Sequence, residues 1–277
     1  GCLIDDGVIL QQGADDYFFT TSTGRAGATL EWIRYQTRYD GWEYYLVNQT
    51  DARAAVNLAG PQARKVLEKT TGDDVSNDAF PYMGVRELTL GQGIPARVMR
   101  LGFVGELSFE IHVPASMAEA LLELLREAGK ELGIRPFGLE AQNVLRLEKG
   151  HIIIGQETEI RTTLHDLGLG FLWHRDKPWA KTVGAPALRF SENQEHRLKL
   201  VGFRTDDPGQ TPGDGSIIVR DKVVGHVCSS RYSACLDASI GMALVEASLA
   251  EPGAKLSIFQ EGMGNNRFTA TVVPRPF

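Results

Sequence analysis

The hydrophobic pattern of the chain changes at about Leu198. Before this point, apolar residues recur at helical spacing in several segments, which alternate with shorter β-type runs. After it the helical period disappears, and Gly, Pro and Asp separate short apolar runs. These runs are KLVGFRT, SIIVRDKVVGHVCSS, SIGMALV, KLSIFQ and RFTATVV. The pattern predicts a small antiparallel barrel or sandwich, with a hairpin around Asp221 and Lys222.

Residues 1–50 mix helical and β-type segments. We expect strands at residues 2–9, 17–21 and 43–48, and a helix that begins near Ser22. A strand, strand, helix, strand order is part of an α+β sandwich. Because no element precedes the first strand, we expect this sub-domain to be incomplete at its N-terminus.

Residues 51–190 repeat the mixture and end in an irregular linker. The predicted elements are a strand and a helix in AAVNLAGPQARKVLEKT, two strands joined at GFVGE, and helices in SMAEALLELLREAGKELG and GLEAQNVLRLEKG. Gly150 is expected to close the last helix. The predicted fold class is therefore α+β in three parts: part of an α+β sub-domain at 1–50, an α+β sub-domain with its linker at 51–190, and a small β-barrel domain at 191–277.

Composition narrows the function classes. Apolar residues make up 43% of the chain and charged residues 23%, as in soluble globular proteins, and no apolar run is long enough to span a membrane. The net charge of -6 argues against a nucleic-acid partner, because phosphate binding requires a basic face. We find no signal peptide, and the three cysteines, which lack metal-ligand spacing, indicate free thiols. We therefore expect a cytoplasmic protein.

Two adjacent acids, Asp5 and Asp6, interrupt the apolar stretch at the start of the chain. Asp-Asp-Gly is favourable turn chemistry between two strands. Alternatively, one carboxylate faces a pocket and acts as a base or as a hydrogen-bond acceptor. The local sequence leaves both interpretations open.

Glu106, in GFVGELSFEI, is another acid within an apolar stretch. In a strand, residues an even number apart share a face, which would place Glu106, Ser108 and Glu110 together in water. Alternatively, a bend at Gly105 aims Glu106 into a cavity. There a carboxylate could accept two parallel hydrogen bonds from a ligand such as a pterin. Both interpretations remain open at this point.

Several catalytic classes lack their motifs in this chain. It has no Gly-rich phosphate loop, no G-x-S-x-G elbow and no H-E-x-x-H. His165 and His174 flank Asp166 and could form a metal site, but packed or solvated histidines explain them more simply, and we predict no metal. These observations argue against a metalloenzyme, a nucleotide hydrolase and a serine hydrolase.

Five motifs occur in a fixed order along the chain: GCLIDDGVIL, LAGPQARKVL, RLGFVGELSFEIHVP, GLEAQNVLRLEKGHIIIGQETE and GHVCSSRYSACLDASIGMALV. Together they resemble the glycine-cleavage T-protein (aminomethyltransferase) family over nearly the whole chain. LRLEKGHIIIGQ followed by DKPW is most similar to the C-terminal region of the sarcosine oxidase alpha subunit. Dimethylglycine oxidase has a similar region.

The resemblance implies a fold and an activity. The fold would be a cloverleaf of three domains around a folate channel, the last of them a small β-barrel. The activity would pass a one-carbon unit, at the iminium or formaldehyde level, from an amine to tetrahydrofolate, giving 5,10-methylenetetrahydrofolate. Because no flavin or NAD fingerprint occurs, FAD, FMN or NAD would belong to other sequence or to partner subunits.

The resemblance also implies site residues. The first acid of the family's DD pair lies beside folate N10, and here it is Asp5. The glutamate of the family's Y-x-G-E binds the pterin and corresponds to Glu106, while Phe103 replaces the tyrosine and keeps a flat apolar wall without the hydroxyl. Gln142 replaces an arginine that contacts the folate tail. Arg146 is retained, either as a folate contact or in a salt bridge to the core.

Other positions depart from the family pattern. The usual T-T-P-x-E is TTLHD, with Leu164 and Asp166, and the usual S-P of the barrel has Ala234. The family also has a first sub-domain before the DD strand. We therefore expect another segment or subunit to complete the folate channel.

The combined interpretation is a folate-binding, T-protein-like region of a sarcosine-oxidase-type alpha subunit. Asp5 would take the N10 or N5 proton of folate, or stabilise the cationic iminium. The expected partners are a small amine substrate, folate and other oxidase subunits, with no nucleic acid or membrane. The alternatives are a stand-alone aminomethyl- or methyltransferase or demethylase, and a non-catalytic folate-binding scaffold.

Overall fold

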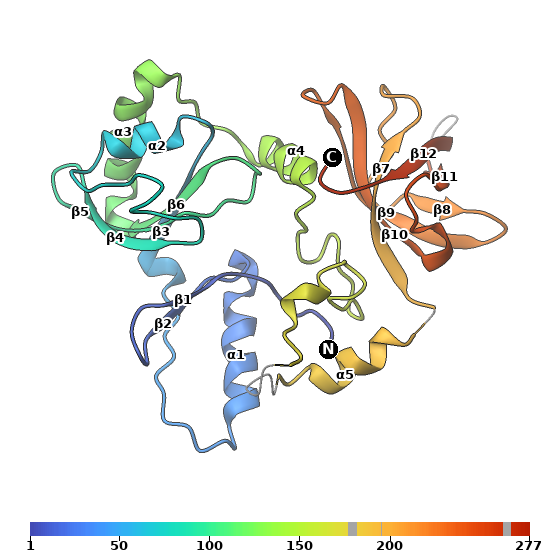
Figure 1. The fold of residues 1–277 in the computed structure, drawn as a ribbon, viewed down its shortest axis with the longest axis horizontal. Coiled ribbons are helices and arrows are strands. Elements are labelled where there is room, and N and C mark those ends of the chain that lie inside the picture. Colours follow the sequence, from blue (N-terminus) through green and yellow to red (C-terminus); the bar gives the residue numbers. More distant parts are fainter. Residues whose placement is uncertain (177–181, 195, 263–266) are drawn as a thin grey trace. The chain divides into compact units, whose positions relative to one another are not determined.

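The computed structural model describes residues 1–176, 182–194, 196–262 and 267–277. The chain forms two compact units, one of residues 7–142 and the other of residues 1–6 together with 143–277 (Figure 1). Both units combine helices and strands, as the predicted α+β class requires. Within the described residues, no helix is long and apolar enough to cross a membrane.

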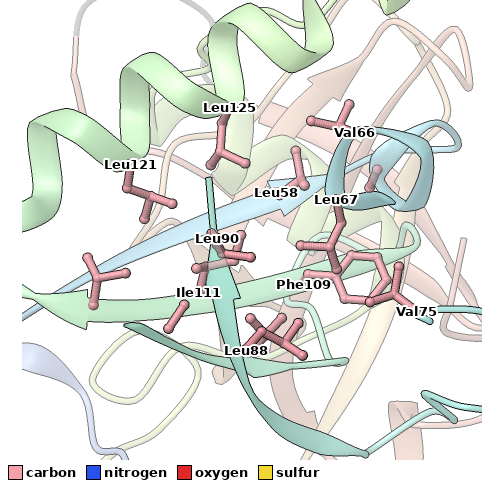
Figure 2. Packing of buried hydrophobic residues seen from close by; sticks show 14 of the residues in the cluster. Leu58, Val66, Leu67, Val75, Leu88, Leu90, Phe109, Ile111, Leu121 and Leu125 are labelled. Atoms are coloured by element: carbon pink, nitrogen blue, oxygen red, sulfur yellow. The ribbon is translucent and has the colours of Figure 1, made fainter. Parts of the chain in front are cut away.

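The unit of residues 7–142 is built on a four-stranded antiparallel sheet in the order β3-β6-β5-β4. Its strands are β3 (Arg53–Ala59), β4 (Val85–Leu90), β5 (Ile94–Met99) and β6 (Ser108–Pro114). The helices α2 (Ala63–Glu68) and α3 (Ala118–Gly129) pack on one face of this sheet. Figure 2 shows Leu121 and Leu125 of α3 directed at the strands, so α3 buries its apolar side on the sheet.

The first part of this unit differs from the sequence prediction. A two-stranded ribbon, β1 (Ile9–Gln11) with β2 (Tyr17–Phe19), precedes α1 (Ala26–Thr37). The predicted strand at 2–9 is wrong over most of its length, because pairing in the ribbon begins only after Gly7. At Gly7 a Cβ would lie 2.0 Å from the carbonyl oxygen of Thr20, so only glycine allows this close approach.

The predicted strand at 43–48 is also wrong. This segment has no regular secondary structure, and Tyr45 within it is 99% exposed. Its run of aromatic and aliphatic side chains, from Tyr44 to Val47, resembles a strand, but among the described residues no neighbouring strand supplies hydrogen bonds to it. A strand pattern without a pairing partner does not make a strand.

The barrel prediction is confirmed. Six antiparallel strands close in the order β10-β7-β12-β11-β8-β9. They are β7 (Leu198–Thr205), β8 (Ile217–Val219), β9 (Val223–Ser233), β10 (Ala238–Glu246), β11 (Lys255–Phe259) and β12 (Arg267–Val273). The predicted hairpin between β8 and β9 is present, with the Arg220 amide donating to the Lys222 carbonyl. Closure removes the sheet edges, and side chains such as Phe203 and Ile258 fill the interior.

Along the chain, β6 and α3 are followed by α4 (Leu139–Lys149), an irregular segment and α5 (Ala185–Glu192), and then by the barrel strands. The end of α4 at Gly150 is confirmed, because Gly150 has a positive φ of +75°, which glycine adopts without strain. The irregular segment is stabilised by side-chain hydrogen bonds instead of a strand ladder. It therefore depends on particular polar residues.

The fold makes a prediction for the sheet core. Phe109 of β6 is fully buried, and its ring centroid lies 5.6 Å from that of Phe80. Phe109→Ala should lower the free energy of unfolding by about 3–5 kcal/mol, from lost burial plus the cavity left behind. Urea denaturation measures it. The control is Tyr82→Ala, at a side chain that is 72% exposed, which should change stability by about 0.5 kcal/mol at most. Equal losses in the two variants would contradict this account of the core.

Candidate functional site

Glu157 is the most completely buried acid of the irregular segment, and three donors converge on its carboxylate. Arg146 Nη1 of α4 lies 3.0 Å from Oε2, and the Ile153 amide donates to the same oxygen at 2.7 Å. Ser229 Oγ of β9 donates to Oε1 at 2.5 Å. A buried charge is stable only when it is paired and hydrogen-bonded, and here both oxygens are.

This ion pair settles where Arg146 lies. The guanidinium is 1% exposed, and its Nη1 also donates to the His151 carbonyl at 3.0 Å. It therefore joins the end of α4 to the segment that follows Gly150. Of the two roles that the sequence left open for Arg146, the geometry supports the salt bridge to the core.

Cys228 lies in the same buried region of β9. Burial, with the negative charge of Glu157 as the next contribution, raises the pKa of the thiol to about 12. The thiol therefore stays protonated at neutral pH and is not a nucleophile. The other two cysteines, Cys2 and Cys235, are exposed and free.

The N-terminal residues are attached to this unit by backbone hydrogen bonds. The Leu3 amide donates to the Thr162 carbonyl at 2.8 Å, and Cys2 forms an isolated antiparallel bridge with Thr163. Asp5 follows two residues after Leu3 and is half-buried. The acid pair thus depends for its place on the segment that Glu157 organises.

The charge of Asp5 acts on the adjacent acid, Asp6. Burial and then the negative charge of Asp5 raise the pKa of Asp6, while its own backbone hydrogen bond and nearby His151 act in the opposite direction. The charge of an adjacent carboxylate disfavours the ionised form of Asp6. Such a pair, with an imidazole nearby, is suited to holding or moving a proton.

Asp166 is a buried acid to which the sequence gave no structural role. Its Oδ2 accepts from the Thr163 amide and hydroxyl at 2.8 and 2.9 Å, and its Oδ1 accepts from Arg197 Nε at 2.7 Å. Burial by itself raises the pKa of Asp166, but the hydrogen bonds from Arg197 and Thr163 outweigh it and hold that pKa below its usual range. Asp166 therefore fixes the turn to which the N-terminal residues bind.

Phe103 and Glu106 lie in the unit of residues 7–142, in the connection between β5 and β6. The predicted bend is present, because Gly105 has a φ of +83°. Glu106 lies before β6 and is exposed, and Phe103 is half-buried. The Glu106 backbone carbonyl accepts from the Ser108 hydroxyl at 3.1 Å, but its carboxylate forms no hydrogen bond or ion pair with any described residue. The carboxylate is therefore available to a ligand.

The expectation that Glu106, Ser108 and Glu110 share one wet strand face is wrong. Glu106 precedes the strand, and Ser108 is buried. Glu110 Oε1 lies 2.5 Å from His112 Nε2, and Phe18 of β2 packs edge-on against the His112 ring. The second face of the sheet is thus covered, which the simple alternation of strand residues does not reveal.

The predicted site residues therefore divide between the units, with Asp5 and Arg146 in one and Phe103 and Glu106 in the other. His165 Nε2 lies 3.4 Å from Glu192 Oε1, and its ring packs against Trp173. Within the described ranges, no group of three or more His, Cys, Asp or Glu side chains could hold a metal ion.

Comparison with known proteins identifies the family. Residues 1–177 match the family described as GCVT N-terminal domain, and residues 199–277 match the glycine cleavage T-protein C-terminal barrel domain. The chain belongs to the glycine cleavage T-protein family. The second match covers the closed barrel described above.

Similar proteins fall into two groups of different length. The chain is 35% identical over 259 residues to the sarcosine oxidase subunit alpha of Corynebacterium sp. (strain P-1), covering 89% of this chain and 26% of that one. It is 31% identical to an aminomethyltransferase of Halothermothrix orenii, covering 100% of this chain and 74% of the relative. The chain thus spans about a quarter of the length of the sarcosine oxidase subunit.

A solved structure confirms the fold. The glycine cleavage system aminomethyltransferase T from Bartonella henselae superposes with a TM-score of 0.82 at 23% identity, over 99% of this chain and 72% of that one. The T-protein-like α+β architecture with its terminal barrel, expected from the motifs, is therefore present.

The buried ion pair gives a prediction about stability. Glu157→Gln should lower the free energy of unfolding by about 3–5 kcal/mol, because the Arg146 guanidinium would remain buried without a counter-charge. Differential scanning calorimetry of the purified chain measures the loss.

The matched control is Glu159→Gln. Glu159 is 58% exposed and lies 3.5 Å from His226, so its loss should cost at most about 1 kcal/mol. Similar losses in both variants would mean that the Glu157 pair is no more important than a surface pair.

Proposed function

We propose that this chain passes a one-carbon unit at the iminium or formaldehyde level from an N-methyl amine such as sarcosine to tetrahydrofolate, giving 5,10-methylenetetrahydrofolate. The observation that carries the proposal is the pair of adjacent acids, the half-buried Asp5 and the exposed Asp6, in a chain of the T-protein family. The similarity to a sarcosine oxidase alpha subunit supports an N-methyl amino acid as the source of the carbon.

In this proposal Asp5 is the catalytic residue. Tetrahydrofolate is itself the nucleophile, so the protein needs to orient it, accept a proton and offset positive charge on the iminium. A carboxylate beside N10 or N5 can accept the proton and can also offset the positive charge. Support comes from the partial burial of Asp5 and from its negative charge, which helps to raise the pKa of the neighbouring Asp6.

Glu106 and Phe103 are proposed as pterin contacts. An exposed carboxylate without an intramolecular partner can accept the paired N–H donors on the edge of a pterin, and an aromatic ring offers a flat apolar surface for it. For Arg146 the buried pair with Glu157 supports a positioning role, so the proposal assigns it no direct contact with folate.

The amine would be oxidised elsewhere. FAD, FMN or NAD are assigned to sequence outside this chain or to other oxidase subunits, in keeping with the partial coverage of the sarcosine oxidase relative. A cytoplasmic location is part of the proposal and is supported by the three free thiols.

Asp5→Asn tests the catalytic role. The substitution is nearly isosteric but removes the base and the negative charge, so one-carbon transfer should fall on the order of a hundredfold or more. The assay follows 5,10-methylenetetrahydrofolate formation from sarcosine and tetrahydrofolate, with a sarcosine-demethylating oxidase supplied and a blank without the chain subtracted. Hydrogen peroxide release is measured in the same assay to check that the supplied oxidase works equally well with the wild type and the variant.

Asp6→Asn is the control at the adjacent acid and should reduce transfer far less. Wild-type transfer by Asp5→Asn would remove Asp5 from the mechanism. If the wild-type chain binds folinic acid but does not accelerate product formation over the blank, the result would favour a folate-binding scaffold.

Glu106→Gln tests the pterin contact independently of catalysis. The change turns one acceptor into a donor that faces a donor of the ligand, which should weaken folinic acid binding roughly ten- to hundredfold. Isothermal titration calorimetry measures the Kd.

The matched control is Glu123→Gln, at an exposed residue of α3 in the same unit. Glu110 is unsuitable because its carboxylate is engaged with His112. Equal affinities for wild type, Glu106→Gln and Glu123→Gln would show that Glu106 is only a solvated acid.

A further inference from the structure

The residues that follow β12, 274–277, pack back onto the unit of residues 1–6 and 143–277. The Phe277 amide donates to the Glu148 carbonyl of α4 at 3.0 Å, and the Phe277 ring packs against a buried cluster that includes Met242 of β10. Arg275, between the end of β12 and Phe277, is half-buried. This segment, which we call the β12 extension, therefore connects the barrel to the end of α4.

The Arg275 guanidinium is held by backbone carbonyls. Its Nη2 donates to the Leu167 carbonyl at 2.9 Å and to the Leu200 carbonyl at 3.4 Å, and its Nη1 lies 3.4 Å from the Met242 sulfur. Burial lowers the pKa of Arg275, while the negative charge of Glu157 acts in the opposite direction. Among the described residues no carboxylate contacts the guanidinium, and an apolar side chain of similar volume is often the more stable choice for such a position. The two carbonyls that Arg275 joins therefore explain this arginine better than stability does.

Two glycines leave space for the Arg275 side chain. At Gly202 of β7, a Cβ would lie 2.8 Å from Arg275 Cγ and 3.1 Å from Phe277 Cζ. Glycine weakens the interior of a strand, so this close approach explains its presence there. At Gly150 a Cβ would lie 3.1 Å from Arg275 Cβ. The space for the β12 extension is thus built into the fold.

Leu167 lies in the turn that supports the N-terminal residues. It directly follows Asp166, whose carboxylate accepts from the Thr163 amide and hydroxyl. Thr163 in turn forms the antiparallel bridge with Cys2. Asp166 and Arg275 therefore hold the same turn at two points, Asp166 through Thr163 and Arg275 through the Leu167 carbonyl.

We propose that Arg275 is a positioning residue for the one-carbon transfer. It fixes the Leu167 carbonyl relative to β7, and so keeps in place the turn to which the backbone before Asp5 is bound. The inference rests on the catalytic role proposed for Asp5, while the effect of Arg275 on the N-terminal backbone does not depend on that role. A catalytic acid requires such support, because misplacement by about an ångström is costly to rate.

Arg275→Met tests the proposal, because it removes the guanidinium and keeps an apolar chain of similar length. Hydrogen–deuterium exchange of the chain without ligand should become about tenfold faster or more in peptides that cover residues 2–8, since hydrogen bonds from a charged donor are lost. In the assay with sarcosine and tetrahydrofolate, kcat should fall about tenfold or more, while the KM for tetrahydrofolate stays within about twofold.

Arg275→Lys is the conservative variant. Its ammonium group can still donate to a carbonyl, so it should recover most of kcat and most of the protection from exchange. The matched control is Ile258→Val, in a buried barrel cluster that does not include Leu167. It should lower the melting temperature and leave kcat and the exchange of residues 2–8 unchanged.

Unchanged exchange of residues 2–8 in Arg275→Met, or an equal change in Ile258→Val, would overturn the proposal whatever the role of Asp5. A higher KM with unchanged kcat would also overturn it, because Arg275 would then act on folate binding. Faster exchange with wild-type kcat and KM would do the same. In that case Asp5→Asn shows which proposal has failed: wild-type transfer by that variant removes the role of Asp5, and loss of transfer removes only the role of Arg275.

Discussion

The unit that contains the barrel depends on one buried ion pair, between Arg146 and Glu157. Taking both charges out of water is costly, and the cost is offset only because the Ile153 amide and the Ser229 hydroxyl complete the coordination of the carboxylate. These contacts join α4, the irregular segment and strand β9. The segment after Gly150 contains few backbone ladders, so it relies on these contacts and, further along, on the Asp166 network.

The position of Asp5 follows from this arrangement. The irregular segment continues to Thr162 and Thr163, where Asp166 fixes the turn and the N-terminal residues bind through Leu3 and Cys2. A catalytic group gains from a rigid support, because misplacement by about an ångström is costly to rate. A buried polar network, and not regular secondary structure, thus holds the backbone that carries this acid pair. Glu106, in the other unit, relies instead on the backbone bend at Gly105.

Much of the fold was predictable because its signals are local. The barrel follows from period-two runs and turn residues, and the ends of α4 and of the β8–β9 hairpin follow from Gly150 and from the Asp221–Lys222 turn. The strand expected at 43–48 failed because pairing depends on a partner that sequence spacing does not reveal. Glu157 and Asp166 were missed as structural acids, since their partners, such as Ser229 and Arg197, lie far along the chain.

The central proposal is that this T-protein chain binds folate, with the segment around Asp5 in one unit and the segment around Glu106 in the other each affected by the ligand. Hydrogen–deuterium exchange of the chain, with and without saturating folinic acid, tests it directly for each unit by itself. The account predicts slower exchange in peptides that cover residues 2–8 and residues 101–108. Unchanged exchange in both regions would contradict it.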